Sequence, residues 1–353
     1  MSSEPLVTVV VACRNESRHI RVFLESLLSQ QTGAITWEAV LADGMSDDGT
    51  RDVIAGITSR DPRIRVIDNP GRIVSTGLNA AIRSARGHLI LRMDAHTEYA
   101  SDYIRRCVET MRRTGADNVG GPARTRSEGL WGRAIAAAYH SRFACGGAGF
   151  HDTAFEGFVD TVPYGCWRRE KLIEIGLFDE HLVRNQDDEL NLRLARAGGK
   201  IYQSPTIVSW YHPRSSLSAL FRQYLQYGFW KVAVIRKHRI PASPRHLVPG
   251  AFVSSLVLVA IGTAAAMVFN QPAWATALAA LWTAMFALYA GAASAAAFAV
   301  SRRDGWELLC LLPIVFCAYH FGYGIGFLAG LWRFGLQRNW RAGTGGAFAE
   351  LTR

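Results

Sequence analysis

Three long apolar runs in the carboxyl-terminal part constrain the fold of this chain most. They extend over residues 247–269, 274–300 and 308–332, and none contains Asp, Glu, Lys or Arg. A helix needs about 20 apolar residues to cross the hydrocarbon core of a bilayer, and three consecutive uncharged runs are rare in soluble domains. We therefore expect about three transmembrane helices. The alternative is a set of buried helices in a soluble domain.

The rest of the 353-residue chain has a different composition. Residues 1–246 contain nearly all the charge and alternate between strand and helix patterns. Such a break in composition indicates two unlike parts joined in one chain. We expect a catalytic domain over residues 1–212, a basic interfacial helix over 213–246, transmembrane helices over 247–333 and a tail over 334–353.

The charge of the chain is unevenly distributed. The formal net charge is +10, and much of it lies between Arg214 and Arg245. A basic segment beside a membrane part favours anionic lipid headgroups as its partner. Nucleic acid is the competing partner of a basic chain, but no recognition motif accompanies the charge. We therefore expect membrane lipids, and no nucleic acid, as partners of this segment.

The position of the basic residues also predicts an orientation in the membrane. No basic leader precedes the first apolar run, which has only the length of a strand, so we expect a cytosolic catalytic domain on a multi-pass protein of the inner membrane. Three full spans would place Arg333, Arg338 and Arg341 outside the cell, against the positive-inside rule. Either the last apolar run is re-entrant or the rule fails for this tail.

Four strand-helix units follow one another in the first 113 residues. We expect strands over 6–13, 37–43, 63–68 and 88–94, and helices over 16–31, 48–57, 75–85 and 102–113. The strands are continuous apolar runs, as in parallel sheets that are buried on both faces. This alternation predicts an α/β fold with a doubly wound sheet.

The pattern is less regular beyond residue 118. The glycine-rich segment 145–150 indicates a flexible loop, and residues 159–167 have the composition of a strand. We expect a short helix over 187–197 and a long, basic, aromatic-rich helix over 216–240 that lies on the membrane surface.

Polar side chains follow the predicted strands at their carboxyl ends. Asn15 and Glu16 come after the first strand, and Asp43 ends the second. In a doubly wound sheet this edge forms the nucleotide crevice, so Asp43 is placed to accept hydrogen bonds from a base or ribose. The alternative for the acidic residues of the second turn, such as Asp48, is a helix-capping role.

The fourth strand ends in the sequence LRMDAH, which presents two metal-binding side chains. Asp94 and His96 are two residues apart and can reach the same divalent cation. About ninety residues later Asp187, Asp188 and Glu189 open a helix and offer a second carboxylate, although acids in a first turn often only stabilise the helix. A cation site and a separate base suggest transfer chemistry on a diphosphate.

These motifs, in this order and spacing, resemble the inverting family 2 glycosyltransferases of the GT-A fold over residues 6 to about 240. VVVACRNES and ADGMSDDGT resemble the first two turns of that family, and LRMDAH resembles its DxD element, with His96 in the second acidic place. NQDDELNLRL resembles its base motif, with Gln186 in the place of Glu. NPGRIVSTGLNAAI and VDTVPYGCWRRE are similar to the membrane-attached glucosyltransferases of succinoglycan-type exopolysaccharide assembly.

The resemblance implies a Rossmann-like, doubly wound mixed sheet and roles for individual residues. Asp94 and His96 would hold Mn²⁺ or Mg²⁺ against the donor diphosphate, and Asp187 would be the general base, with Asp188 and Glu189 as alternatives. His212 would be a further metal ligand or a structural histidine. A guanidinium can donate two parallel hydrogen bonds to phosphate oxygens, so Arg214 is a candidate ligand of the diphosphate.

The implied activity is transfer of a sugar from a nucleotide-sugar donor to a lipid-linked acceptor. We expect a UDP-sugar, with UDP-glucose favoured, and a polyprenyl-diphosphate-linked saccharide in bacterial polysaccharide assembly. Two alternatives stay open. One is a polyprenyl-phosphate sugar synthase, and the other is a non-catalytic membrane subunit that binds a nucleotide-sugar.

Overall fold

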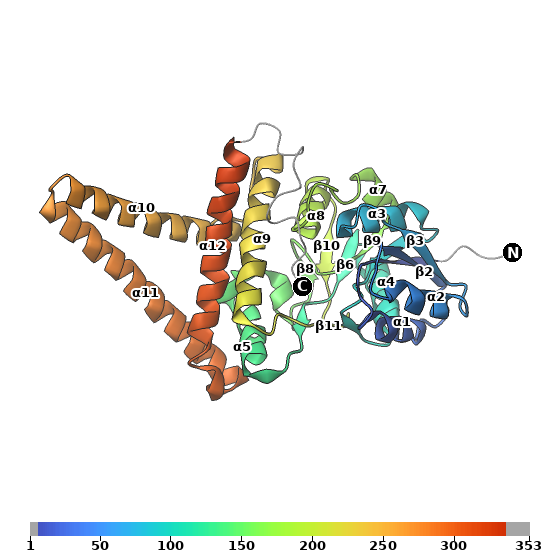
Figure 1. Ribbon diagram of the computed structural model, residues 1–353. Helices are drawn as coiled ribbons and strands as arrows, with labels where there is room; N and C mark the ends of the chain where they lie inside the picture. The colour runs from blue at the N-terminus through green and yellow to red at the C-terminus, as the bar shows by residue number, and fades with distance from the viewer. Residues whose placement is uncertain (1–5, 337–353) are drawn as a thin grey trace. The chain divides into compact units, whose positions relative to one another are not determined.

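The computed structural model describes residues 6–336, which divide into two units (Figure 1). Among the described residues, the sheet unit comprises residues 6–126 and 148–212, and the helical unit comprises residues 127–147 and 213–336. One boundary thus follows His212, where we placed the end of the catalytic domain. Residues 127–147 belong to the helical unit, although we had included them in that domain.

The sheet unit contains an eight-stranded mixed sheet with the order β3-β2-β1-β4-β9-β6-β10-β8. Strands β1 to β4 are parallel, and β9 is antiparallel to both β4 and β6. Because β1 to β4 run the same way, their carboxyl ends lie at one edge of the sheet. The strands are β1 (Val7–Cys13), β2 (Trp37–Asp43), β3 (Ile64–Asp68), β4 (Leu89–Arg92), β6 (Asn118–Gly120), β8 (Gly157–Phe158), β9 (Cys166–Arg168) and β10 (Ile201–Gln203).

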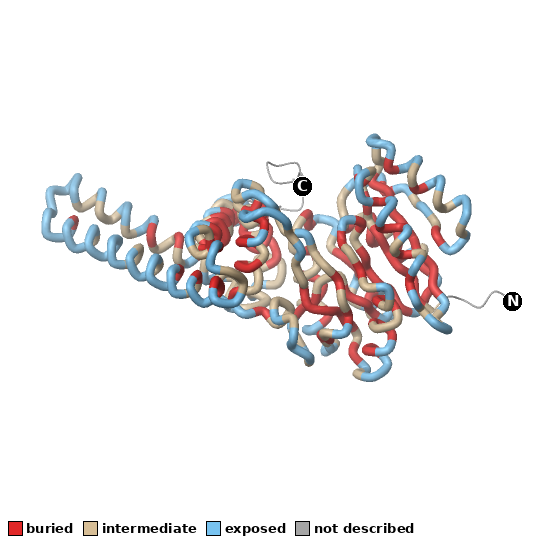
Figure 2. The backbone as a smooth tube through the Cα atoms, turned by 90° about the horizontal axis from the view of Figure 1, so that it is seen from below, coloured by how far each residue is buried: buried red, intermediate tan, exposed pale blue. Residues whose placement is uncertain are grey.

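Helices cover both faces of this sheet, and the central strands are buried (Figure 2). Successive strand residues point to opposite faces, so Val9 of β1 lies in one core cluster and Val10 in the other. The first cluster includes residues of α1 (Ile20–Leu28), α2 (Thr50–Thr58) and α4 (Tyr103–Thr114), and the second includes residues of α3 (Val74–Ser84), α7 (Arg169–Glu174) and α8 (Gln186–Arg196). The predicted doubly wound α/β fold is confirmed.

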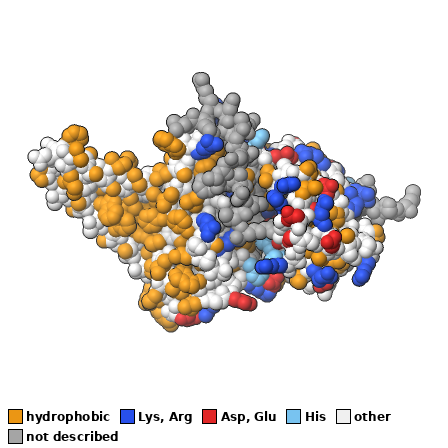
Figure 3. Space-filling model, in the orientation of Figure 1, with side chains coloured by type: hydrophobic (Ala, Val, Ile, Leu, Met, Phe, Trp, Pro, Cys, Tyr) orange, Lys and Arg blue, Asp and Glu red, His pale blue; other side chains and the backbone are white. Residues whose placement is uncertain are grey.

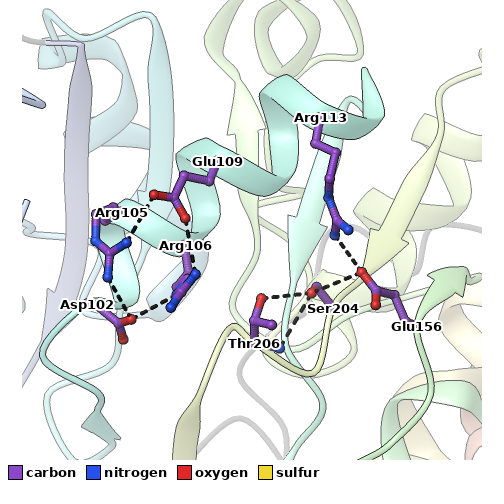
Figure 4. Close-up of polar contacts among 8 residues, drawn as sticks. All are labelled: Asp102, Arg105, Arg106, Glu109, Arg113, Glu156, Ser204 and Thr206. Carbon is purple, nitrogen blue, oxygen red and sulfur yellow. Dashed lines mark hydrogen bonds and ion pairs between the residues drawn. The ribbon is translucent and has the colours of Figure 1, made fainter.

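A smaller sheet and the polar face of α4 complete this unit. The smaller sheet has the order β5-β11-β7 and is formed by β5 (Glu98–Tyr99), β11 (Ser209–Tyr211) and β7 (Arg124–Thr125). Asp102, directly before α4, accepts hydrogen bonds from Arg105 and Arg106 at 3.0 and 2.8 Å, and Arg113 near the end of α4 contacts Glu156 at 2.5 Å (Figure 4). Exposed ion pairs of this kind add little stability. The network therefore marks the solvent-facing side of α4.

The helical unit includes the three apolar helices that the sequence predicted. They are α10 (Val248–Val268), α11 (Pro272–Asp304) and α12 (Leu312–Leu336), and each is long and apolar enough to cross a membrane. The unit also contains α5 (Gly129–Tyr139), α6 (Arg142–Cys145) and α9 (Leu217–His238), and α9 packs along α12. The expected helix over 216–240 is therefore present, in contact with another helix.

Two local predictions for the region after residue 118 are wrong. Residues 159–167 do not form one strand, because Tyr164 and Gly165 have positive φ angles of 63° and 74° and turn the chain before β9 begins. The helix α5 lies in a region where we expected irregular structure. The apolar face of α5 is formed by Ala134, Ile135 and Ala138, all of which are buried. The glycines before and after this segment obscured its helical pattern in the sequence.

Candidate active site

The first two turns of the sheet edge are joined by hydrogen bonds. The side-chain amide of Asn15 donates to Asp47 at 2.9 Å and accepts from the Asp47 backbone N–H at 3.1 Å, and the Asn15 N–H donates to the Ser46 hydroxyl at 2.9 Å. Asn15 has a positive φ of 56°, which Asn tolerates better than most residues. Asn15 thus fixes the shape of the edge at which we predicted the nucleotide.

Asp43 is fully buried and holds the second turn. Its carboxylate accepts from the backbone N–H and hydroxyl of Ser46 at 3.0 and 2.5 Å, and from Arg51 at 2.6 Å. Each carboxylate oxygen can accept more than one hydrogen bond. Asp43 thus has a structural role in the second turn. Its contact with a base or ribose stays a prediction, and the two roles are compatible.

Asp48 closes the second turn directly before Gly49, the N-cap residue of α2. It accepts hydrogen bonds from Thr50 and from the Ser17 backbone N–H. Burial opposes ionisation of Asp48, but these hydrogen bonds outweigh it and hold the pKa of the carboxyl well below its usual range. Asp48 therefore has a structural role, in which it holds the N–H of Thr50 at the start of α2 and joins the two turns through Ser17.

Arg92 joins the two acidic motifs at the centre of this edge. It is the last residue of β4 and has a nearly buried side chain, of which 6% is exposed. Its guanidinium donates to both oxygens of Asp94, at 3.1 and 3.2 Å, and to Asp187 from the first turn of α8. The predicted metal ligand and the predicted base, 93 residues apart in the chain, are thus bound to the same side chain.

The surroundings of Asp187 suit a proton acceptor. Burial raises the pKa of its carboxyl, Asp94 and Asp188 raise it further, and Arg92 opposes these effects. About 38% of the Asp187 side chain is still exposed, so the carboxylate is crowded by protein atoms and yet reachable. A carboxylate with a raised pKa and an open side is a better base than an ordinary surface acid.

The first turn of α8 distinguishes the alternative bases. Glu189 is fully buried and forms an ion pair with Arg193 at 2.8 Å, and Arg193 also donates to the backbone carbonyls of Ile175 and Leu177. This network holds the preceding loop against α8, so Glu189 has a structural role. Asp188 is half-buried next to Asp187 and stays an alternative.

The predicted metal ligands lie in different local environments. The imidazole of His96 is 46% exposed and lies 3.5 Å from the Glu16 carboxylate, which is buried. His212 lies 2.8 Å from Glu98, which also pairs with Arg126. Within residues 6–336, no group of three or more His, Cys, Asp or Glu side chains is placed to hold a metal ion.

A cation that bridges a diphosphate needs only one or two protein ligands, because phosphate oxygens and water supply the others. The side chain of Asp94 is 20% exposed and offers a carboxylate, and His96 offers an accessible imidazole two residues later. A carboxylate is a donor that suits Mn²⁺ and Mg²⁺, whereas the softer imidazole would favour Mn²⁺ over Mg²⁺. Arg214 belongs to the helical unit, and its role as a diphosphate ligand stays a prediction.

Arg92 was not among the site residues predicted from the sequence. The signal was an arginine at the end of an otherwise apolar strand, directly before the metal-binding motif. A buried guanidinium requires a counter-charge, and the nearest acidic residue in the chain is Asp94. The hydroxyl of Tyr99, which accepts from the Asp94 backbone N–H at 2.7 Å, was missed as well.

Comparisons with known proteins agree with this geometry. The sequence profile of Glycosyl transferase family 2 matches residues 8–175, and the chain belongs to this family. It is 32% identical over 291 residues to the succinoglycan biosynthesis protein ExoA of Rhizobium meliloti (strain 1021), which covers 78% of this chain and 88% of ExoA. It is 30% identical over 239 residues, 65% of this chain and 74% of the relative, to a dolichyl N-acetyl-alpha-D-glucosaminyl phosphate 3-beta-D-2,3-diacetamido-2,3-dideoxy-beta-D-glucuronosyltransferase of Methanococcus voltae.

A solved structure supports the fold. The mannosyltransferase PcManGT from Pyrobaculum calidifontis, in complex with GDP-Man and Mn²⁺, superposes with a TM-score of 0.59 and 19% identity, over 94% of this chain and 88% of that one. At this identity the likeness concerns the fold, which is of the GT-A type predicted from the motifs. The protein is a family 2 glycosyltransferase of polysaccharide or glycan biosynthesis.

Proposed function

We propose that the protein is an inverting, metal-dependent glycosyltransferase that moves a sugar from a UDP-sugar, with UDP-glucose favoured, to a polyprenyl-diphosphate-linked saccharide. The observation that supports this most is the position of Arg92 between Asp94 and Asp187. It brings a candidate cation ligand and a candidate base together at the sheet edge where doubly wound folds bind nucleotides.

In the proposed reaction Asp187 takes the proton of the acceptor hydroxyl as the oxygen attacks the anomeric carbon. The new bond forms on the side opposite the diphosphate, and the bond between the anomeric carbon and the diphosphate oxygen breaks with its electrons staying on the nucleoside diphosphate. The raised pKa of Asp187 favours proton transfer to it, and Arg92 holds the carboxylate in place.

A divalent cation at Asp94 and His96 would supply Lewis-acid neutralisation of the leaving diphosphate. Two known proteins fit this proposal. PcManGT binds GDP-Man with Mn²⁺ on the same fold, and the relative from Methanococcus voltae acts on a dolichyl-linked sugar phosphate. The three apolar helices fit a membrane protein with a lipid-linked acceptor, and we propose that it resides in the inner membrane with the catalytic unit in the cytosol.

The direct test supplies purified protein with UDP-, GDP- and dTDP-sugars, a membrane lipid extract, and Mn²⁺ or Mg²⁺. We expect one UDP-sugar to give a lipid-linked product in which the anomeric configuration is inverted. A product that mild acid cleaves to a lipid monophosphate and a free sugar would instead identify a polyprenyl-phosphate sugar synthase. No turnover with any donor, together with intact nucleotide binding, would favour the non-catalytic subunit.

A further inference from the structure

The helical unit contains two kinds of apolar helix. Helices α10 and α11 form a hairpin that projects from the other helices of this unit, and hydrophobic side chains cover it (Figures 1 and 3). Other parts of the protein bury 11% of the most apolar stretch of α10 and 17% of that of α11, but 50% of that of α12. Helix α12 therefore has a different environment from the hairpin, although all three are apolar.

The hairpin has the dimensions of a membrane-crossing element. Phe252 stacks on Tyr289 near one end, and a Cβ atom on Gly262 would lie 3.3 Å from Leu278 further along, so α10 and α11 are antiparallel neighbours. The 21 residues of α10 are about 31 Å long at 1.5 Å per residue, which matches a hydrocarbon core of about 30 Å.

Helix α12 meets this hairpin at the start of α10 and along the second half of α11, which extends beyond the start of α10. Phe321 lies against Phe252 and Tyr289, with ring centroids 5.9 and 5.8 Å apart, and Gly324 lies against Pro249 and Val253. The partners on α10 thus come from its first turns. A third span running beside α10 and α11 would meet them along their length.

The first half of α12 packs against α5 and α6, which contain charged residues. The Tyr319 hydroxyl donates to the Ile135 carbonyl at 3.3 Å, and His320 contacts the Phe143 carbonyl at 2.8 Å and the Tyr289 hydroxyl at 3.0 Å. On the same helix as Ile135, Arg133 pairs with Glu307. An ion pair with both side chains about half exposed requires water or headgroups, which places this part of α12 outside the hydrocarbon.

The second half of α12 packs against α9 with the two helix backbones very close together. A Cβ atom on Gly322, Gly326 or Gly330 would lie 2.9, 2.0 or 2.6 Å from the carbonyl oxygens of Phe221, Leu225 and Phe229, respectively. The glycines thus permit a very close approach of the two helices. The glycines on α12 and the facing residues on α9 both advance in steps of four. The two helices therefore run parallel, side by side, and must lie at the same depth in any membrane.

Helix α9 cannot cross a bilayer, because its charges are too closely spaced. Its longest stretch without a charged residue is the eight residues from Gln223 to Trp230, between Arg222 and Lys231. A span needs about 20 apolar residues. Since α12 lies at the depth of α9, the same restriction applies to α12. Three of its exposed apolar residues, Ile314, Ile325 and Trp332, are 11 and 7 residues apart and lie on one helix face. Leu331, also exposed, lies about 100° around the helix from Trp332.

We infer that only the α10–α11 hairpin crosses the membrane, and that α9 and α12 form a platform at the cytosolic headgroup layer. The inference rests on the membrane insertion proposed above. The hairpin topology puts the chain segments that flank it on the cytosolic side, as the positive-inside rule requires. Their basic residues are Arg236, Lys237, Arg239, Arg245, Arg302, Arg303 and Arg333, followed in the sequence by Arg338 and Arg341, which lie outside the described residues. A third span would move the last three to the outside.

Labelling of intact cells with a membrane-impermeant maleimide tests this topology. One variant has Gln271→Cys, at the exposed turn of the hairpin, and the other has a cysteine added after Arg353, in the otherwise wild-type chain. We expect Gln271→Cys to be labelled at least tenfold above wild type, and the added cysteine to stay at the wild-type level until the cells are permeabilised.

Two results would overturn the inference. Labelling of the added carboxyl-terminal cysteine in intact cells, at a rate similar to Gln271→Cys, would establish a third span. Absence of label at Gln271→Cys would show that the hairpin does not cross. Transferase activity and resistance to carbonate extraction are measured on the same membranes, so failure of the topology is separate from failure of the proposed enzyme or of membrane insertion.

Discussion

Replacement of Arg92 by Met tests whether this residue serves the reaction or only the fold. The change removes the positively charged guanidinium between Asp94 and Asp187 and keeps most of the side-chain volume. Breaking a fully buried ion pair costs about 3–5 kcal/mol. The two carboxylates here are 20% and 38% exposed, and water will screen them once Arg92 is gone. We therefore expect a loss of about 2–3 kcal/mol.

That loss corresponds to a lower melting temperature by about 5–10 °C for a unit of this size. The pH dependence of kcat should change as well. Arg92 lowers the pKa of Asp187, against the larger effect of burial. Without Arg92 the pKa rises, so a base that must be ionised becomes active only at higher pH. The acidic limb of the profile should move upward, with kcat at neutral pH reduced at least tenfold.

Arg65→Met is the matched control. Arg65 forms an ion pair with the buried Glu38 at 3.2 Å, near the amino ends of β2 and β3 and hence at the opposite edge of the same sheet. It should lower the melting temperature without moving the pH profile. If Arg92→Met left the profile of kcat unshifted at the same loss of stability, the assignment of Asp187 as a base held by Arg92 would be wrong.

The remaining predictions concern single groups of the site. Asp187→Asn should reduce kcat at least a thousandfold with donor affinity unchanged in a binding titration, whereas Asp188→Asn should cost less than tenfold; equal losses would leave the base unassigned. Asp94→Ala should abolish turnover at all Mn²⁺ concentrations, whereas His96→Asp should retain activity and shift the preference from Mn²⁺ toward Mg²⁺, read from initial rates with each metal. Glu189→Gln should lower stability by about 2 kcal/mol in thermal melts and leave the pH profile of kcat unchanged, since this residue supports the loop before α8.

The sequence predicted the strands β1 to β4 well because each is a short apolar run between polar turns. A strand buried on both faces has few other interpretations, and β2 has the expected bounds of Trp37 and Asp43. The strand predicted over 159–167 failed because its composition is apolar while its backbone turns at Tyr164. Composition reports burial, and two residues with positive φ were enough to interrupt a strand.

The contact between Asp94, Arg92 and Asp187 was beyond the reach of sequence patterns. Both acidic motifs were recognised, but their distance in space depends on tertiary structure. β4 pairs with β9, and α8 packs on the face of the sheet that includes Ile90 of β4. The glycines of α12 gave a similar result. Their spacing predicted a face for close packing, but only the structure identifies α9 as the partner.

The charge balance of the site gives Arg92 a reason to be buried. Two carboxylates that face one cation partner are useful for transfer chemistry, because one can bind a metal and the other can take a proton. Without a fixed positive charge, each would raise the pKa of the other, and the fold would lose stability whenever no metal was bound. Arg92 supplies that charge permanently, since a guanidinium stays protonated at any physiological pH. Its fork also fixes the direction of both carboxylates, so the candidate site is already ordered before any substrate binds.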